Sequence, residues 1–333
     1  MFRIPRLPVD LFTLLLVGTV LLASLLPISG PPAEVGRQIA DLLIAWLFFL
    51  HGARLPREAV VSGVTHWRLH LLVFLVTYAI FPLLGLAVTA VMPERLLSPT
   101  LASGVLFLCL LPSTVQSSIA FTSIARGNVA AAVCSSTISN IVGIAVTPLL
   151  VAVLMKTSGA GLSLESLEAI AAQLLLPFVL GQVLHRWLGG WVTRNRRILQ
   201  VTDRGSILLV VYLSFSEAVT RGLWHQIPPV SLLTVAVVCA VILGLLLALT
   251  TVLSRRFGFS REDEAAIVFC GSKKSLVSGV PMAGVLFAPA TVGMVLLPVM
   301  IFHQIQLMVG AAMSRRYAAR AEATATEAAA PAD

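Results

Sequence analysis

Lys273 and Lys274 stand next to each other in an apolar stretch long enough to cross a membrane, which includes FCGSKKSLVSGVP at residues 269–281. A charged side chain near the bilayer centre costs about 3 kcal/mol on insertion scales, so an intramembrane lysine is by default a candidate functional group. Gly271 precedes the pair and Pro281 follows it. Because both residue types disfavour helix, they predict an interruption of the helix that carries the lysines.

The lysine pair admits three interpretations. In the first, an ammonium group reaches the membrane interface, or sits at the C-terminal end of a half-helix where the helix dipole favours a cation. In the second, it binds an anionic substrate directly. In the third, it stands where a coupling cation would bind, or it releases a proton because burial disfavours the charged form. The last two interpretations are compatible with each other.

A second predicted interruption, LPSTVQSS at residues 111–118, opens a region rich in polar side chains that extends to Asn140. Single Ser and Thr residues commonly pack membrane helices together, but Gln116 and Asn140 are harder to explain in that way. An interrupted helix frees backbone N–H and C=O groups that need partners within the membrane. Polar backbone and polar side chains at one depth predict a ligand site, with Gln116 and Ser117 as candidate contacts.

His303 and Gln304 form a third polar feature, in the last apolar run and shortly after Pro298. A single membrane histidine is usually a hydrogen-bonded packing residue, but the neighbouring amide favours a contact with substrate. The candidate substrate-binding residues are therefore Gln116, Ser117, Lys273, Lys274, Ser275, His303 and Gln304. Glu217 lies four residues before Arg221, so an ion pair across one helical turn explains it.

The composition is that of an all-α membrane protein. Hydrophobic residues make up 58% of the 333-residue chain and charged residues 11%, and the mean hydropathy is +0.96. A span needs about 20 mostly apolar residues. On that rule we predict ten spans, at residues 9–28, 36–53, 68–92, 100–124, 128–155, 164–189, 205–222, 228–253, 263–287 and 290–313.

The basic residues predict the orientation of these spans. With the N-terminus in the cytoplasm, only Arg37, Arg95, Lys156 and Arg221 fall outside, and every other basic residue except the two intramembrane lysines falls inside. This asymmetry follows the positive-inside rule. We therefore expect a multi-pass protein of the inner or plasma membrane with both termini in the cytoplasm.

Ten spans divide into two halves of five, and an odd number in each half inverts one half relative to the other. We predict one transporter domain at residues 1–314, with repeats at 9–155 and 164–313, and a disordered tail at 315–333. The two interruptions fall in the fourth span of each half. Paired interruptions in inverted halves indicate the binding site of a secondary transporter.

Other functional classes find little support. The chain has no phosphate-binding glycine loop, no His-Glu-x-x-His motif and no nucleophile elbow, which argues against an enzyme. Its four cysteines lack metal-ligand spacing, and orientation in the membrane explains the net charge of +8 better than a nucleic-acid partner does. We expect no cofactor or metal centre apart from sodium as a coupling ion. The expected partners are the lipid bilayer and a small organic anion, and a monomer is compatible with the sequence.

The segment ARGNVA at residues 125–130 leads into a span that ends in TPLL, and together they resemble the junction of the fourth and fifth helices in the bile acid:sodium symporter family. The pattern KSLxxGxPM at 274–282 and the triplet FHQ at 302–304 resemble a divergent, symporter-like branch of that superfamily. This branch includes many bacterial proteins and eukaryotic members linked to negative regulation of calcium uptake. The resemblance covers the whole ten-span region.

The resemblance implies a core of helices 3–5 and 8–10, a panel of helices 1, 2, 6 and 7, and alternating access between them. It implies that the broken fourth and ninth helices cross in the core. Ser118 and Ser136 match hydroxyl ligands of the family's sodium ions, whereas Ala132 and Ile119 replace a usual serine and asparagine. The candidate ion-coupling residues are Ser118, Ser135, Ser136, Asn140 and Lys273.

The ninth helix departs further from the family pattern. Phe269 stands where sodium-coupled members have a glutamate, Lys273 at a glutamine position and Lys274 at an asparagine beside the cargo. An ammonium group 4 Å from sodium would oppose its binding by about 4 kcal/mol at an effective dielectric constant of about 20. Coupling to two sodium ions is therefore not expected.

These observations predict a secondary transporter of a small organic anion that works by alternating access. The coupling ion is left open among sodium, a proton and none. The alternative is a membrane regulator of calcium homeostasis that transports nothing itself.

Overall fold

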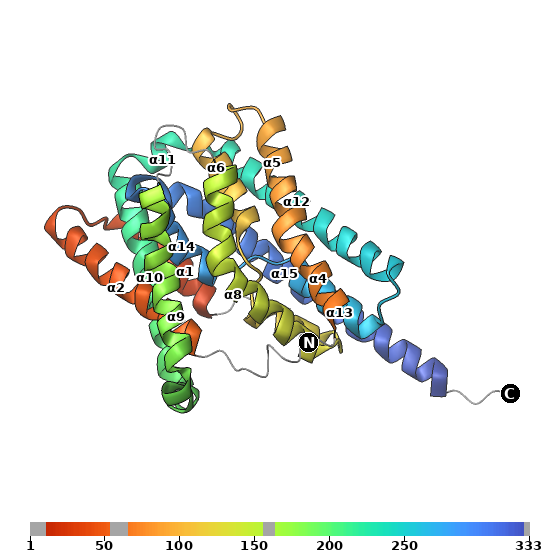
Figure 1. Ribbon diagram of the computed structural model, residues 1–333. Coiled ribbons are helices and arrows are strands. Elements are labelled where there is room, and N and C mark those ends of the chain that lie inside the picture. Colours follow the sequence, from red (N-terminus) through yellow and green to blue (C-terminus); the bar gives the residue numbers. More distant parts are fainter. Residues whose placement is uncertain (1–10, 54–65, 156–163, 330–333) are drawn as a thin grey trace, which may run out of the picture.

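A computed structural model of the chain describes residues 11–53, 66–155 and 164–329, and its regular structure within these ranges is helical throughout (Figure 1). The first half contains α1 (Leu11–Leu25), α2 (Pro31–Ala53), α4 (Trp67–Leu75), the π-helix η1 (Val76–Ile80), α5 (Phe81–Val91), α6 (Pro99–Leu110), α7 (Gln116–Ile124) and α8 (Val129–Leu154). The second contains α9 (Leu164–Arg194), α10 (Arg196–Thr220), α11 (Leu223–Gln226), α12 (Pro229–Arg256), α13 (Arg261–Gly271), α14 (Leu276–Leu286) and α15 (Pro289–Ala329).

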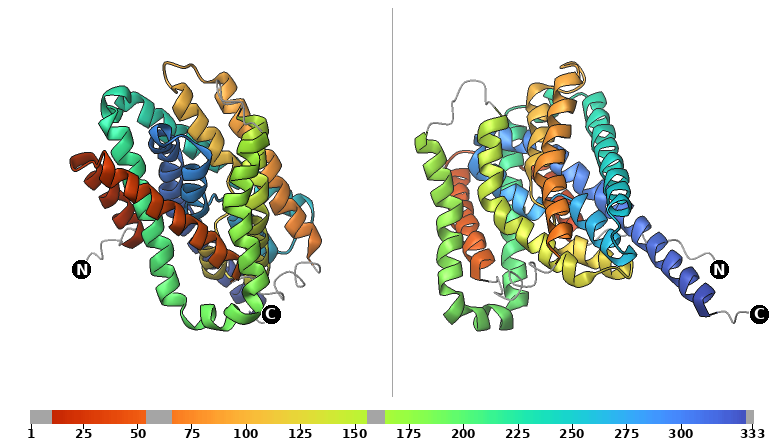
Figure 2. Two further views of the ribbon diagram at one scale, coloured as in Figure 1. Left: turned by 60° about the vertical axis from the view of Figure 1, so that its left-hand side comes forward. Right: turned by 45° about the vertical axis from the view of Figure 1, so that its right-hand side comes forward.

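The helices α1, α2, α9 and α10 pack against one another on one side of the molecule (Figures 1 and 2). Two glycines allow α2 and α9 to approach closely. A Cβ atom on Gly52 would lie 2.0 Å from the carbonyl oxygen of Phe178, and one on Gly181 would lie 1.9 Å from that of Phe49. The backbones of the two helices are therefore in direct contact, as at small-residue interfaces of membrane helices.

The remaining long helices form a second group, in which α6 packs against α5 and α15, and α13 packs against α12, α8 and α7. The continuous helix α4–η1–α5 contains a π-helical turn that ends at Ile80, two residues before Pro82. Proline has no backbone N–H, so Pro82 cannot donate to the carbonyl group four residues earlier, as another residue would in an α-helix. A π turn is one way to accommodate this missing hydrogen bond.

Both predicted interruptions are present. Residues 111–115 separate α6 from α7, and residues 272–275 separate α13 from α14. The two interruptions touch each other, because the backbone N–H of Ser275 donates a 2.8 Å hydrogen bond to the carbonyl oxygen of Pro112. We call residues 111–115 and 272–275 together the crossing.

The loop between α7 and α8 explains the ARGN segment singled out in the sequence. Asn128 caps α8, where its Oδ1 accepts a 2.9 Å hydrogen bond from the N–H of Ala131. Its Nδ2 donates to Asp263 at the start of α13 over 2.8 Å. The same asparagine therefore begins one helix and ties it to the other interrupted segment.

The helix boundaries agree with the predicted spans within about five residues, except that α10 begins at Arg196 instead of residue 205 and α15 continues to Ala329. Residues 9 and 10 of the first span lie outside the described part. Within the described ranges, four helices are both long and apolar enough to cross a membrane, namely Trp67–Val91, Val129–Leu154, Pro229–Arg256 and Pro289–Ala321. The interruptions shorten α6, α7, α13 and α14, and α2 carries Glu34, Arg37 and Asp41.

The end of α15 differs from the sequence-based prediction. Helix continues to Ala329 and projects beyond the other helices, whereas the sequence predicts a disordered tail from residue 315 (Figure 1). Its residues are mostly alanine, arginine and glutamate, which have high intrinsic helix propensity, so the segment needs no packing partner to favour a helix. Residues 330–333 of the predicted tail lie outside the described part.

The glycine contact yields a stability prediction. Gly181→Ala should destabilise the protein by about 1–3 kcal/mol, because its methyl group overlaps the α2 backbone. Gly190→Ala in the same helix is the matched control. No atom lies within 4 Å of a Cβ built there, so this change should stabilise slightly through helix propensity. Thermal unfolding of the detergent-purified variants measures both, and equal melting temperatures would contradict the close contact.

Candidate functional site

The carbonyl groups at the end of α13 are paired by hydroxyl groups from the other interrupted segment. Ser113 donates to the carbonyl oxygen of Cys270 over 2.6 Å, and Ser118 donates to that of Phe269 over 2.8 Å. The last carbonyl groups of a helix have no partner within it, so they need donors from elsewhere when buried. These two serines supply them.

α8 and α14 support the crossing through a small polar network. The N–H of Ser113 donates to Ser139 Oγ over 3.0 Å, and Asn140 Nδ2 donates to the carbonyl oxygen of Ser113. Ser278 Oγ donates in turn to Asn140 Oδ1 over 2.7 Å. Tyr78 from η1 donates to the carbonyl oxygen of Ser139. These hydrogen bonds therefore hold the first interruption against α8 and, through Asn140, link it to α14.

The ammonium group of Lys274 is surrounded by backbone. Its Nζ donates to the carbonyl oxygens of Thr77 and Cys109 over 2.9 Å each and to that of Leu111 over 2.6 Å. The ring of Phe81 lies 4.0 Å from it. The residue is only 1% exposed. Lys274 thus pairs carbonyl groups at the end of α6, where the helix dipole favours a positive charge.

Lys273 is as deeply buried but is held differently. Its Nζ lies 4.0 Å from the ring centroid of Phe121 and 5.8 Å from that of Phe269. It donates one 3.3 Å hydrogen bond to the carbonyl oxygen of Gln306. The environment of this ammonium is therefore dominated by cation–π contacts.

The side-chain amide of Gln306 forms two hydrogen bonds with the backbone of the second interruption. Its Oε1 accepts from the N–H of Lys274 and its Nε2 donates to the carbonyl oxygen of Lys274, each over 2.9 Å. Nε2 also lies 3.1 Å from Nδ1 of His303. One amide therefore connects the backbone beside the buried lysines to the histidine.

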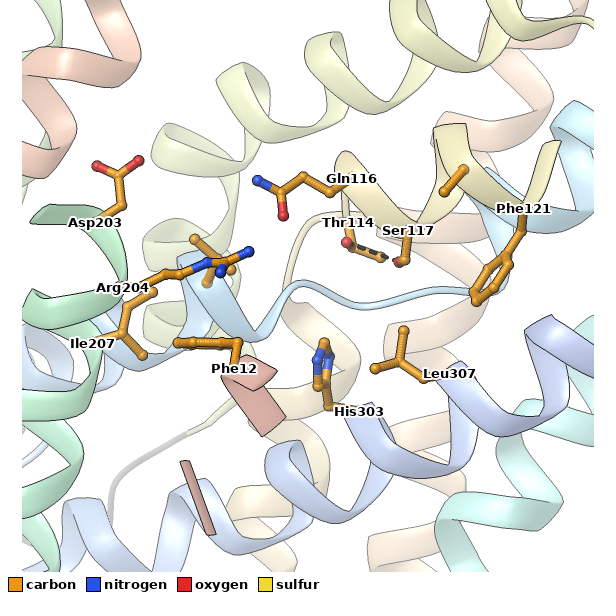
Figure 3. A pocket seen from close by; sticks show the side chains of 12 residues that line it. Phe12, Thr114, Gln116, Ser117, Phe121, Asp203, Arg204, Ile207, His303 and Leu307 are labelled. Atoms are coloured by element: carbon orange, nitrogen blue, oxygen red, sulfur yellow. Dashed lines mark hydrogen bonds between the residues drawn. The ribbon is translucent and has the colours of Figure 1, made fainter. Parts of the chain in front are cut away.

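A cavity of about 320 Å³ lies between α10 and the start of α7, with α1, α14 and α15 completing its walls. Figure 3 shows Gln116 from α7, Arg204 from α10 and His303 from α15 directed toward the same space. Thr114, Ser117 and Phe121 also line it. Asp203 borders the cavity, but its carboxylate is turned away from these groups (Figure 3).

A second, more apolar cavity of about 250 Å³ lies on the other side of the first interruption. Its polar lining comes from His51, Thr137, Asn140 and Ser278. Asn140 and Ser278 also belong to the network that supports the crossing. The crossing is therefore flanked by two cavities.

Residues 10–319 match the SBF-like CPA transporter family. The chain belongs to this family. It is 58% identical over 317 residues to the protein named "Uncharacterized protein PA2026" of Pseudomonas aeruginosa, covering 95% of each chain. It is 51% identical over 322 residues to "Putative symporter YfeH" of Escherichia coli, covering 97% of this chain and 96% of that one. It is 26% identical over 300 residues to "Sodium/bile acid cotransporter 7" of Rattus norvegicus, covering 89% and 88%.

The chain is therefore a multi-pass membrane protein of the SBF-like CPA transporter family, and it is a transporter homologue rather than an enzyme. Its similarity to the rat protein agrees with the resemblance seen in the sequence.

The structure places the candidate substrate-binding residues in two groups. Gln116, Ser117 and His303 line the larger cavity. Lys273, Lys274 and Ser275 are buried behind it, where Ser275 caps α14 by accepting from the N–H of Ser278 over 3.1 Å. Gln304 is half-buried and is not among the residues that line the cavities.

The candidate ion-coupling residues are distributed over several contacts. Ser135 Oγ lies 2.6 Å from Nδ1 of His70, whereas Ser136 donates to the carbonyl oxygen of Ala132 over 2.6 Å. Lys273 belongs to the crossing, Asn140 donates to the carbonyl oxygen of Ser113 within it, and Ser118 donates to the carbonyl oxygen of Phe269 at the end of α13. The hydroxyl hydrogens of Ser118 and Ser136 thus bond to backbone carbonyl groups.

Several residues of the site were not identified from the sequence. The positive-inside pattern places Arg204 among the cytoplasmic basic residues, and Gln306 is not among the candidate residues. Helical spacing gives the missing signal for Gln306, since residues three apart share a face and His303 and Gln306 are so spaced. Nothing in the local sequence indicates that the carbonyl group of Thr77 bonds to Lys274.

Gln306→Ala should lower the melting temperature of the purified protein more than Gln304→Ala does. The change leaves the buried N–H and C=O of Lys274 without their amide partner, at about 1–3 kcal/mol for each group. Gln304 is not part of this contact. An equal, small effect of the two substitutions on thermal unfolding would show that the amide does not hold the interruption.

Proposed function

We propose that this protein is a secondary transporter that moves a small organic anion across the inner or plasma membrane by alternating access. The observation that carries the proposal is the convergence of Gln116, Arg204 and His303 on one cavity beside an interrupted helix. Polar residues placed where two helix halves meet are typical of the substrate sites of secondary transporters.

The proposed architecture has ten spans in two inverted repeats of five, at residues 9–155 and 164–313, with both termini in the cytoplasm. α1, α2, α9 and α10 form the panel, and the other long helices form the core with its interrupted pairs α6–α7 and α13–α14. The cavity supports this assignment, because α1 and α10 line it from one side and α7, α14 and α15 from the other. Movement of the panel past the core would then expose the cavity to either side.

Charge and hydrogen-bond donors favour an anion as the cargo. The guanidinium group of Arg204, which lines the cavity, is of a type that can form paired hydrogen bonds with carboxylate or phosphate oxygens. Gln116 also begins α7, and the N–H groups of a first helical turn favour negative charge. His303 and Ser117 add further polar contacts. Lys273 and Lys274 lie behind the cavity wall, so we assign them to coupling and to support of the helices rather than to direct contact with cargo.

A panel of organic and inorganic anions tested for thermal stabilisation of the purified protein would identify the cargo class, since a ligand of the folded state raises its melting temperature. Arg204→Gln should weaken binding of the stabilising anion about tenfold to a hundredfold, as expected for loss of a charged hydrogen bond. Arg194→Gln, on the exposed end of α9, is the matched control.

If no anion stabilises the protein and none is taken up by proteoliposomes, the transport proposal fails. The remaining candidate would then be a regulator that acts on another membrane protein. If an anion binds the Arg204→Gln variant as well as the unsubstituted protein, then this cavity does not recognise that anion through Arg204.

Replacing sodium with choline in a proteoliposome uptake assay tests whether anion uptake is coupled to sodium. We expect uptake of the identified anion to be unchanged. The resemblance places Phe269 where sodium-coupled members have a glutamate, and Nζ of Lys273 lies 5.8 Å from the centroid of its ring. An imposed proton gradient tests the proton in the same vesicles. A loss of uptake in choline would instead establish sodium coupling.

A further inference from the structure

The helix α4–η1–α5 leaves one backbone carbonyl group without a hydrogen-bond partner inside the helix, whereas an ordinary α-helix would pair it. The N–H of Phe81 bonds to the carbonyl oxygen of Val76, five residues earlier. In an α-helix that N–H would bond to the carbonyl oxygen of Thr77, four residues earlier. The π turn therefore releases the carbonyl oxygen of Thr77, which points into the protein and is bonded by Lys274.

The end of α6 presents two more carbonyl groups at the same place. Pro112 cannot donate a backbone hydrogen bond, so the chain leaves the helix there. Thr147 donates to the carbonyl oxygen of Leu110 over 2.9 Å. The neighbouring carbonyl groups of Cys109 and Leu111 turn instead to Nζ of Lys274.

Three carbonyl oxygens from two helices thus surround one point, at 2.9, 2.9 and 2.6 Å, with the ring of Phe81 4.0 Å away. An ammonium group has three N–H donors, and here each has one acceptor. Carbonyl oxygens, the negative end of a helix and an aromatic face are all features that attract a cation. The same groups would suit a free monovalent cation.

We propose that this is a monovalent-cation site and that the ammonium group of Lys274 is its permanent, covalently attached occupant. Removal of the side chain should open the site to ammonium, methylammonium or an alkali-metal ion. The proposal concerns the crossing and makes no use of the cargo cavity, so it stands independently of the transport function proposed above.

Lys273 provides the internal comparison. It precedes Lys274 directly and is equally buried, at 1% exposure. Its Nζ has one carbonyl contact, at 3.3 Å, and two aromatic rings. By the same criteria its surroundings do not form a cation site. The two lysines therefore predict different responses to added cations.

The test uses purified full-length Lys274→Ala, Lys274→Met, Lys273→Ala and unsubstituted protein in thermal unfolding. Ammonium, methylammonium, sodium and potassium chloride are compared with choline chloride at equal ionic strength. At least one small cation should raise the melting temperature of Lys274→Ala saturably, by about 5 °C, beyond its effect on the unsubstituted protein. Lys274→Met should not respond, because its side chain fills the space, and neither should Lys273→Ala.

The proposal is overturned if no small cation stabilises Lys274→Ala more than choline does, or if Lys274→Met and Lys273→Ala respond equally. If Lys274→Ala is not folded in choline, extraction in ammonium or methylammonium chloride should restore a monodisperse peak in size-exclusion chromatography. A variant that stays aggregated in every salt also overturns it. Failure to find a transported anion leaves this test unaffected.

Discussion

Backbone N–H and C=O groups in the apolar part of a bilayer have to find partners within the protein, because water does not reach them. An unbroken helix meets this requirement internally, whereas each interruption in this chain releases several groups at once. The positions of most polar side chains around the crossing follow from that constraint. They pair groups that residues 111–115 and 272–275 leave without helical partners.

The two interruptions are not equivalent in how they meet the constraint. At the end of α13, hydroxyl groups of Ser113 and Ser118 donate to backbone carbonyl oxygens. At the end of α6, the ammonium group of Lys274 takes the corresponding role, with Thr147. A charged donor makes stronger hydrogen bonds than a hydroxyl group, but its burial is costly without partners. Three well-placed carbonyl groups reduce that cost for a side chain that is 1% exposed.

The sequence allowed the helical class, most helix boundaries and both interruptions to be predicted, because apolar runs, Gly271 and Pro112 carry that information locally. The start of α10 and the end of α15 were not predicted, because both lie in polar sequence outside the apolar runs. It also identified both lysines as exceptional. It did not distinguish their surroundings, because two adjacent residues in a non-helical segment point in directions that only the packed helices determine. Gln304 was chosen over Gln306 from adjacency to His303, although helical spacing favours Gln306. Arg204 lies in a helix far from the other site residues in sequence, so its place in the cavity depends on tertiary packing.

Two side chains that line the cavity also contact groups at or beside the crossing. His303 lines the cavity, and its Nδ1 lies 3.1 Å from the amide that holds the backbone of Lys274. Phe121 lines the cavity with its ring against the ammonium group of Lys273. A ligand that engages His303 competes for the hydrogen-bonding capacity of the Gln306 amide, and one that displaces the Phe121 ring changes the stabilisation of a buried charge. A coupling free energy requires such differential contacts rather than proximity alone. The cavity and the buried lysines therefore contact the same few groups, which is the physical requirement for a ligand in the cavity to influence the crossing.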